Sequence, residues 1–453
     1  MKHLLTFALL GSLGFSYAQE LPDARGREIV FRDVHVIPMD RERVLKNQTV
    51  PVRDGRITAM EDAKRAKYGA GALVIDARGQ YLMPGLAEMH AHVPPVDDLE
   101  PMKEVLLLFA SQGITTIRGM LGHPRHLELR SKIRSGEILG PRFYTTGPSF
   151  NGQSVKTAAQ GAEMVRQQKE AGYDYLKLHP GLTKETFAAI AQTAKEVGIP
   201  FVGHVSFEVG VWRAIDAGYS SIDHLDGFVE GTVPGIEAMT EKQTGLFGMF
   251  IADRADTTQI PRLTRALKDR NVWVVPTQAL AERWFSPLDP EALRKAPEMK
   301  YMSPEVRNTW ATSKQNLQAN PQYDREKIGD FIRLRRRLIA ACQKNGVGLL
   351  LGSDAPQVFN VPGFSTHQEL QYLVDAGLSP YQALRTGTVN VAAYLQQADS
   401  GVLRVGAVSD LVLLAGNPLD DIRQSTRVEG VMLGHRWLSK AYLEKELQKL
   451  VKP

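Results

Sequence analysis

Pro84-Gly-Leu-Ala-Glu-Met-His-Ala-His92 is a short, mostly apolar segment that ends in two histidines separated by one residue. Side chains alternate between the two faces of a β-strand, so His90 and His92 point to the same side if the segment is extended. A His-x-His pair is weak by itself, because it occurs by chance in many folds. Its meaning depends on what other strands place beside it.

Short apolar segments of this kind recur along the chain, and most are followed by a stretch with helical periodicity. Repeated strand–helix units predict an α/β fold with a parallel sheet, and eight of them predict a closed (β/α)8 TIM barrel. The predicted strands are residues 81–89, 113–117, 142–146, 174–178, 200–204, 220–224, 272–276 and 348–352.

The two ends of the chain have a different pattern. Short alternating strands within residues 19–82 return within residues 401–453, and we expect them to form one small β-sandwich domain beside a barrel of residues 83–400. Residues 279–345 hold more than one helix requires, which predicts a helical lid over the mouth of the barrel. Its aromatic residues fit either a bulky apolar substrate group or packing within the lid; they are Trp284, Phe285, Tyr301 and Trp310.

Side chains that can bind a metal stand at the ends of the predicted strands. They are His90 and His92 after the first strand, Lys177 in the fourth, His204 after the fifth, His224 after the sixth and Asp354 after the eighth. TIM-barrel enzymes gather catalytic groups at the carboxyl ends of several strands. Imidazole and carboxylate are usual ligands of zinc and similar divalent ions. Each residue alone has an ordinary alternative, such as a structural histidine or a helix-capping aspartate, but their coincidence favours a metal site.

Lys177 and Arg118 each leave two interpretations open. A protonated lysine beside two divalent cations would be repelled, and burial also disfavours its charge. Lys177 is therefore either a surface or salt-bridged lysine, or one carbamylated by carbon dioxide to an anionic two-oxygen ligand that bridges two metals. Arg118, at the end of the second strand, pairs either with a substrate carboxylate or with a structural partner.

The chain resembles the amidohydrolase superfamily, most closely its imidazolonepropionase-like and prolidase-like (Xaa-Pro dipeptidase-like) branch. The resemblance rests on residues 84–92, Gly113-Ile-Thr-Thr-Ile-Arg118, Tyr175-Leu-Lys177, Gly203-His204, Asp223-His224, Gly352-Ser-Asp-Ala355 and Gly406-Ala-Val-Ser-Asp-Leu-Val-Leu413. It implies that two divalent ions, expected to be zinc, are bound. His90, His92 and Asp354 would hold one ion, His204 and His224 the other, and a carbamylated Lys177 would bridge them.

Three positions depart from the pattern of that superfamily. Glu88 stands where many relatives have aspartate, and Gly119 stands where many carry an acidic residue. Phe207 occupies the place where single-metal deaminases usually have glutamate, and those deaminases also lack the lysine of the fourth strand. Phe207 and the presence of Lys177 both favour hydrolysis over deamination.

The resemblance implies a metal-dependent hydrolase of C–N (amide or peptide) bonds in a small substrate, such as a dipeptide or an N-acyl amino acid. A metal-bridging hydroxide would attack the carbonyl, and Asp354 would act as general acid and base. One alternative is the same centre acting on an ester, lactone or phosphoester. Another is a non-catalytic binding protein on the same barrel, which would be expected to have lost a ligand, and none is missing.

The first residues of the chain predict export. Met1-Lys2-His3, an apolar run over residues 4–15 and Ser16-Tyr17-Ala18 form the pattern of a signal peptide (residues 1–18) cleaved after Ala18, so we expect a secreted or periplasmic protein. That run is too short to span a membrane. The formal net charge of +5 accompanies no motif that reads nucleic acid, so we expect a small-molecule substrate rather than a nucleic acid. Association of the chain with itself stays open.

Overall fold

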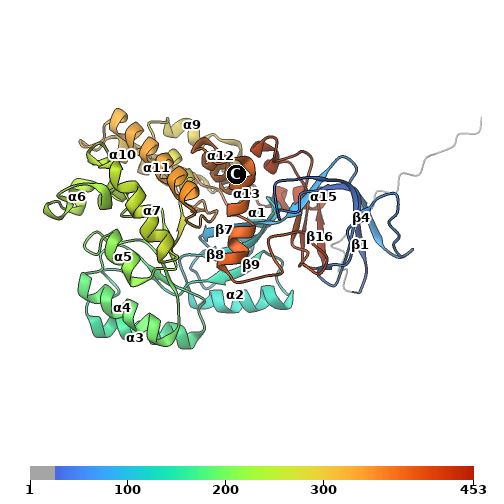
Figure 1. Cartoon of the computed structure of the whole chain (residues 1–453), viewed down its shortest axis with the longest axis horizontal. Coiled ribbons are helices and arrows are strands. Elements are labelled where there is room, and N and C mark those ends of the chain that lie inside the picture. The colour runs from blue at the N-terminus through green and yellow to red at the C-terminus, as the bar shows by residue number, and fades with distance from the viewer. Residues whose placement is uncertain (1–25) are drawn as a thin grey trace, which may run out of the picture.

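The computed structural model describes residues 26–453, and its centre is a set of short parallel strands (Figure 1). One sheet has the order β7-β8-β9 and a second has the order β10-β11-β12-β13. Their bounds are β7 Leu86–Ala91, β8 Ile114–Gly119, β9 Arg142–Thr145, β10 Leu176–Leu178, β11 Phe201–Gly203, β12 Ser221–Asp223 and β13 Trp273–Val275. The predicted α/β class is therefore correct, and the signal peptide lies outside the described residues.

Isolated parallel bridges connect these strands further. Thr146 pairs with Tyr175, which joins the end of β9 to the start of β10. The eighth predicted segment, 348–352, is not a regular strand, but Leu349 pairs with Val274, and Leu351 O accepts a hydrogen bond of 2.8 Å from Met89 N. This segment therefore lies between β13 and β7. Closure of all eight into one barrel stays a prediction that these pairings support.

The predicted first strand, residues 81–89, is wrong as a single strand. β6 (Tyr81–Pro84) pairs with β14 (Leu411–Leu414) outside the barrel strands, and β7 begins only after Gly85. The chain passes so close to β8 at this point that a Cβ on Gly85 would lie 2.2 Å from Thr115 Cγ2. Glycine thus allows one continuous apolar stretch to serve two different sheets.

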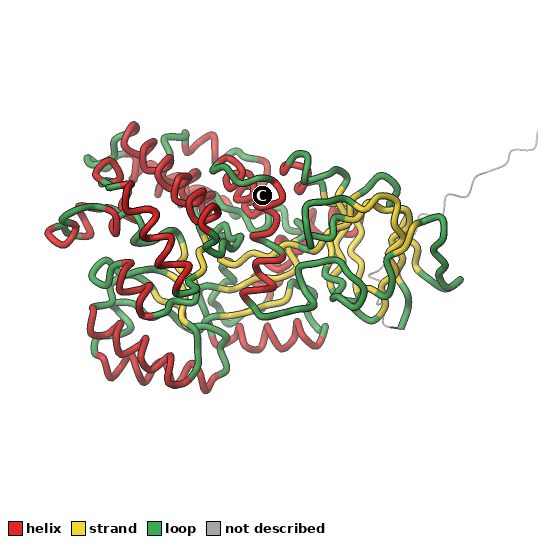
Figure 2. Tube along the Cα trace, viewed as in Figure 1, coloured by secondary structure: helices red, strands yellow, loops and turns green. Residues whose placement is uncertain are grey.

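Helices follow most of the parallel strands and surround them (Figure 2). Several begin at a side chain that accepts a backbone N–H, such as Thr157 and Thr183, and end at a left-handed glycine, such as Gly172 and Gly198. The helices are α1 Glu100–Ser111, α2 Pro124–Ser135, α3 Ala158–Ala171, α4 Lys184–Val197, α5 Val211–Ala217, α7 Ile260–Asp269, α11 Arg325–Asn345, α12 Phe364–Asp375, α13 Pro380–Thr386 and α14 Val389–Tyr394.

Two long insertions interrupt this alternation. Residues 225–259, between β12 and α7, hold short turns that sequence analysis did not identify: η1 Glu230–Thr232, η2 Ile236–Ala238, α6 Glu241–Thr244, η3 Leu246–Gly248, η4 Ala252–Arg254 and η5 Thr257–Gln259. The expected helical excess after β13 contains α8 Gln278–Leu280, η6 Ala281–Phe285, α9 Pro290–Arg294, η7 Pro297–Tyr301 and α10 Pro304–Gln318 before α11. Phe285, Tyr301 and Trp310 are buried in hydrophobic clusters, which favours packing over contact with a substrate. A role as a lid stays a prediction.

Strands from both ends of the chain form one nine-stranded sheet, which lies at the end of the molecule away from α3 to α7 (Figure 1). Its path is β16-β15-β14-β6-β1-β2-β3, with β4 on β2 and β5 on β1. The remaining bounds are β1 Ile29–Val36, β2 Leu45–Arg53, β3 Arg56–Ile57, β4 Glu61–Asp62, β5 Leu73–Asp76, β15 Val428–Leu433 and β16 Arg436–Ser439, with η8 Ile422–Thr426 and α15 Lys440–Lys449 nearby in sequence. The joining of the two ends is as expected, and the sandwich arrangement stays a prediction.

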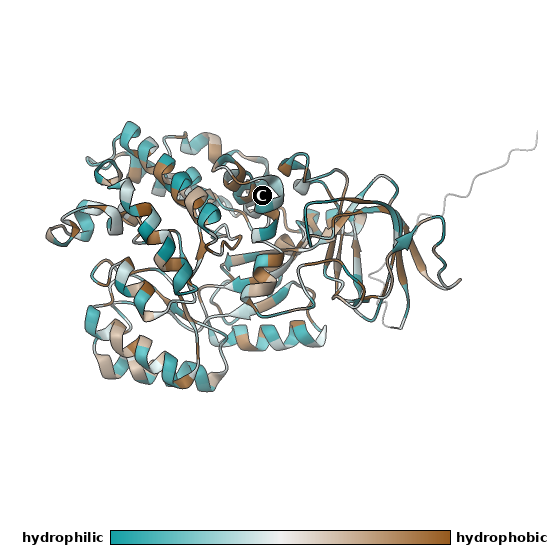
Figure 3. Ribbon diagram, in the orientation of Figure 1, coloured by the Kyte–Doolittle hydropathy of each residue, from teal (hydrophilic) through white to brown (hydrophobic). Residues whose placement is uncertain are grey.

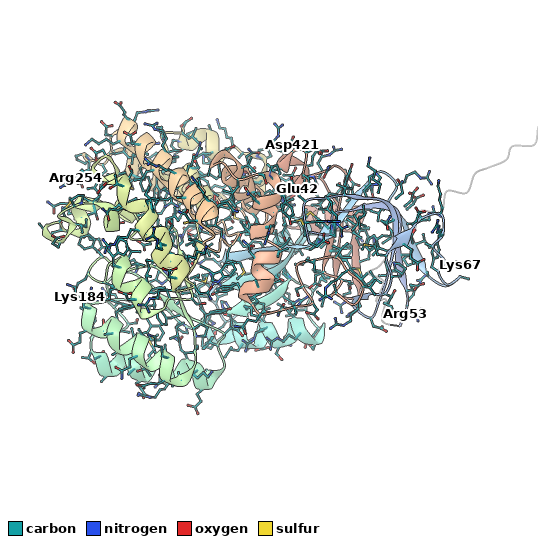
Figure 4. All side chains as sticks on the ribbon, viewed as in Figure 1. Glu42, Arg53, Lys67, Lys184, Arg254 and Asp421 are labelled. Carbon is teal, nitrogen blue, oxygen red and sulfur yellow. The ribbon has the colours of Figure 1, made fainter. Side chains whose placement is uncertain are left out.

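Apolar and polar faces follow this architecture. Helices alternate brown and teal faces in Figure 3, because one stripe of each packs on the strands. Figure 4 shows Arg53, Lys67, Lys184 and Arg254 on the outside, and all four are exposed. Among residues 26–453, no helix is long and apolar enough to cross a membrane.

Candidate metal centre

His90, His92 and Asp354 meet at the carboxyl end of β7. The Asp354 Oδ1 atom lies 2.7 Å from His92 Nε2 and 3.5 Å from His90 Nε2. His90 and Asp354 are buried, whereas the His92 side chain is 18% exposed. One carboxylate thus contacts both histidines of the pair, and the outer histidine keeps access to solvent.

His204 and His224 follow β11 and β12 directly, and their rings extend the same cluster. The ring centroids of His204 and His224 are 4.4 Å apart, and those of His90 and His224 are also 4.4 Å apart. Lys177, in the middle of β10, places Nζ 3.5 Å from His90 Nε2. All six residues expected from the sequence therefore come together. Ligand atoms of His90, His224 and Asp354 lie within 4.8 Å of one another, close enough to share one ion.

Three of the histidines are oriented by a hydrogen bond at Nδ1. His90 Nδ1 lies 2.8 Å from Asp223 Oδ2, His204 Nδ1 lies 2.9 Å from Asp226 Oδ2, and His224 Nδ1 lies 2.9 Å from Thr277 Oγ1. A carboxylate can only accept, so the Nδ1 of His90 and of His204 carries the hydrogen and Nε2 keeps a free lone pair. Partners of this kind orient metal-binding histidines in proteins.

Two atoms of the cluster are buried without any hydrogen-bond partner, His224 Nε2 and Asp354 Oδ1. Asp354 Oδ1 lies close to His92 Nε2, but the contact does not have the geometry of a hydrogen bond. Buried polar atoms without a partner are costly unless something else binds them. Nitrogen and carboxylate donors that face one another in a buried space fit a divalent metal ion.

Burial keeps the cationic forms of this cluster unfavourable. Burial, and next the charge of Lys177, lower the pKa of His204 to about 3 and hold the pKa of His90 well below its ordinary value. Burial also lowers the pKa of Lys177 to about 8, although Asp223 and Asp354 oppose that shift. Neutral imidazole is the form that binds metal, so the environment prepares the histidines for it.

Glu88 links His90, on β7, to the loop that carries Asp354. Its Oε1 accepts hydrogen bonds from His90 N (3.1 Å) and Ser353 N (2.7 Å), and its Oε2 accepts from the hydroxyls of Ser353 (2.7 Å) and Thr366 (2.8 Å). The side chain is fully buried, and burial raises its pKa to about 7. The Glu88 side chain therefore has a structural role, because its four hydrogen bonds connect β7 with Ser353 and Thr366.

Arg118 lies behind the cluster and not in its opening. It is fully buried, and its guanidinium donates to Met89 O (2.8 Å), Ser221 Oγ (3.1 Å) and Tyr394 OH (2.9 Å), with Asp223 at 3.4 Å. Its Cζ lies 5.5 Å from the ring centroids of Tyr175 and Tyr394. This geometry favours the structural partner over a substrate carboxylate.

Phe247, in the insertion 225–259, covers the second histidine pair. Its ring stacks on His224 (5.2 Å between centroids, 19° between planes) and on His204 (5.9 Å, 16°). Phe247 has φ 57°, and His224 and Asp354 also have positive φ, at 64° and 66°. Left-handed backbone at such residues costs energy and clusters at functional sites. Sequence analysis missed Phe247, because its contact with the histidines depends on an insertion without periodicity.

Asp226 and Thr277 were also missed, although they orient two histidines. Asp226 follows His224 by two residues, but its carboxylate contacts His204 Nδ1. Thr277 follows β13, and its hydroxyl contacts His224 Nδ1. Asp223 had a signal, since it immediately precedes His224 in the quoted motif. The pairing of each carboxylate with a histidine from another strand is a tertiary property.

Comparison with known proteins agrees with this geometry. The model of the amidohydrolase family matches residues 81–438. The ochratoxinase of Aspergillus niger is 23% identical over 382 residues, which cover 76% of this chain and 72% of that enzyme. Among solved structures, a bottromycin amidohydrolase aligns with a TM-score of 0.71 and 22% identity, covering 95% of this chain and 91% of its own. A putative prolidase from Bifidobacterium longum aligns with a TM-score of 0.66 and 23% identity, covering 94% and 99%. These solved structures share the fold.

Proposed function

The chain belongs to the amidohydrolase family and is a hydrolase of carbon–nitrogen bonds, and we propose that it cleaves the amide bond of a dipeptide or an N-acyl amino acid at this centre. The observation that carries the proposal is the convergence of the histidines and Asp354, two of whose buried polar atoms, His224 Nε2 and Asp354 Oδ1, have no hydrogen-bond partner. We further propose that a closed (β/α)8 barrel supports the centre, because its catalytic groups follow the ends of successive parallel strands.

The donor set divides into two halves. His90, His92 and Asp354 would hold one divalent ion, His204 and His224 the other, and Lys177, carbamylated, would bridge them. When bound, such ions polarise the scissile carbonyl and lower the pKa of an attacking water. We propose zinc, since nitrogen-rich sets of this kind suit it.

The protein's own residues would manage the proton and exclude water. Asp354 is the carboxylate nearest both His90 and His92, so it would take the proton of the attacking water and pass it to the leaving amine. Glu88 accepts hydrogen bonds from the backbone N–H and the hydroxyl of Ser353, the neighbour of Asp354. Phe247 covers the His204 and His224 rings from one side.

Metal analysis coupled to a substrate panel tests this proposal. Protein loaded with zinc should cleave dipeptides and N-acyl amino acids faster than lactones, aryl esters or phosphoesters of similar size. His224→Asn should lose bound metal and activity. His123→Asn, at the N-terminus of α2, is the matched control and should keep both. Metal-free protein with full activity, or preference for an ester, would overturn the proposal.

Lys177 allows a separate test of the bridging group. Metal uptake by the wild type should increase when bicarbonate is added to carbon dioxide-depleted protein, and uptake by Lys177→Met should not respond. An equal response of both proteins would contradict carbamylation while leaving the metal centre itself untouched.

We also propose that the protein acts outside the cytoplasm. The proposal rests on the signal-peptide pattern of residues 1–18, and N-terminal sequencing of protein from the exported fraction of an expressing cell should begin at Gln19. Mature protein that retains Met1 in the cytoplasmic fraction would contradict it.

A further inference from the structure

A cavity lies near the metal centre, between the loop that follows β11 and the insertion 225–259. Val205 and Asp226 line it, and both adjoin His204, the first as its neighbour in sequence and the second through the 2.9 Å contact with Nδ1. Phe247 lines it as well, with its ring against His204 and His224. A group bound in this cavity would therefore lie one side chain away from the His204 and His224 rings, behind Asp226 and Phe247. The helices that border it, α5 and α6, lie on the side of the molecule away from the nine-stranded sheet (Figure 1).

The walls of the cavity are large, apolar and held in place. Trp212 donates its indole N–H to Gly231 O at 3.1 Å, and the Arg262 guanidinium lies 4.4 Å from the centroid of its ring. Gly231 lets the two walls approach, because a Cβ there would lie 2.3 Å from Val211 Cγ1. Phe207 and Leu246 also line the cavity. Such walls bury apolar surface of a ligand without a large cost in side-chain ordering.

The ionisable residues that line the cavity, within the described part of the chain, are all acidic: Asp226, Glu230 and Glu241. Glu230 Oε2 is buried and has no hydrogen-bond partner. Burial and the charge of Asp226 raise the pKa of Glu230. A substrate carboxylate would lose its hydration in this cavity, and none of the described lining residues supplies a cation to compensate, so binding of a carboxylate there is unfavourable. An orphaned oxygen there favours a ligand that brings a hydrogen-bond donor.

We propose that this cavity binds an aromatic side chain of the substrate that carries a hydrogen-bond donor, such as the phenol of tyrosine, with the donor directed to Glu230. The inference rests on the proposed amide hydrolysis and adds the substrate class. The walls contribute the apolar contact, and Glu230 distinguishes tyrosine from phenylalanine. Glutamate is disfavoured because no cation among the described lining residues can pair with its carboxylate.

The first experiment compares dipeptides that pair alanine with tyrosine, phenylalanine, alanine or glutamate, in both orders. Because the cavity buries the aromatic side chain, kcat/KM for the best tyrosine substrate should exceed that for alanylalanine by about tenfold or more. Phenylalanine should be intermediate and glutamate the poorest. Glu230→Leu should reverse the order of tyrosine and phenylalanine. Equal rates for all four residues, or an unchanged order in Glu230→Leu, would overturn the proposal.

A filling variant shows whether the effect comes from this cavity. Ile236 lines the cavity, whereas its neighbour Glu237 is exposed and outside the lining. Ile236→Trp should lower kcat/KM for the tyrosine dipeptide by about tenfold or more and leave alanylalanine nearly unchanged. Glu237→Trp adds the same bulk outside and should change neither. Equal effects of the two variants would contradict the assignment.

Binding measured without turnover separates this inference from the proposed function. Tyrosinamide and alaninamide are titrated into metal-free protein by calorimetry, and tyrosinamide alone should bind, with Ile236→Trp abolishing the signal. If tyrosinamide binds in this way while no dipeptide is cleaved, the cavity assignment holds and the proposed function fails. If dipeptides are cleaved while tyrosinamide does not bind, the proposed function holds and the cavity assignment fails.

Discussion

Asp223 contacts both His90 and Arg118 in the fully buried region behind the metal centre, and we predict that Asp223→Asn destabilises the protein and weakens metal binding. Its Oδ2 lies 2.8 Å from His90 Nδ1, and both of its oxygens lie 3.4 Å from Arg118 Nη2. Asparagine keeps the shape of the side chain but removes its charge. The Arg118 guanidinium is then buried without a counter-ion.

The size of the effect follows from these contacts. Removing one member of a buried ion pair costs roughly 3–5 kcal/mol. Because 3.4 Å is long for a charge-assisted hydrogen bond, we expect the lower end, about 3 kcal/mol, in the free energy of unfolding. The loss of a partner behind a metal-binding histidine typically lowers metal affinity by roughly 10–100-fold.

Two assays measure the two effects separately. Urea unfolding of the metal-free protein reports stability, and competition for zinc with a chromogenic chelator reports affinity. Arg118→Met serves as the control in a double-mutant cycle. The double variant removes the uncompensated charge, so its loss of stability should be smaller than the sum of the two single losses, while its metal affinity stays low. Wild-type stability of Asp223→Asn, or strict additivity in the cycle, would refute the reasoning.

Three further predictions concern single residues. Asp354→Asn should lower kcat by roughly 10²–10⁴-fold while the protein keeps most of its bound metal, as measured by elemental analysis; near-normal turnover would remove Asp354 from the proton pathway. Arg118→Lys should lower the urea midpoint but leave the ratio of kcat/KM between substrates with and without a carboxylate unchanged, and a selective loss on the carboxylate substrate would restore its role in binding. Burial lowers the pKa of His367 to about 4, whereas the unfolded chain titrates near 6.5, so its neutral form contributes stability that is present above pH 6.5 and lost towards pH 4. That loss is about 3 kcal/mol. His367→Gln should lack this part of the pH dependence, and parallel unfolding midpoints of variant and wild type from pH 7 to pH 4 would contradict it.

The pattern of strands and helices was largely readable from the sequence, because burial between parallel strands and surrounding helices leaves a clear periodicity. Five of the predicted strand ranges contain β9 to β13 with shorter bounds, whereas β7 and β8 overlap their predicted ranges and each end two residues beyond them. The error at residues 81–89 has a physical cause. Hydrophobic periodicity does not reveal that Gly85, packed against Thr115, divides one apolar stretch between two sheets.

The insertion 225–259, unlike the strands, could not be predicted from periodicity. It consists of short turns whose apolar residues follow no regular period, so nothing in its pattern predicts a wall of the site. Phe247 contacts His204 and His224 only because the whole insertion folds back over them. Long-range packing decides such contacts.

The sequence by itself determined which residues are candidate metal donors. Residue types and their positions after successive strands named His90, His92, Lys177, His204, His224 and Asp354, because alternation in a strand and the common edge of parallel strands are local rules. Only the tertiary structure decided how those donors are held. It paired His90 with Asp223, His204 with Asp226 and His224 with Thr277, and it enclosed Arg118 where an interpretation from sequence allowed a substrate contact. Hydrogen-bond partners and burial depend on where distant segments meet in space, and no local pattern encodes that meeting.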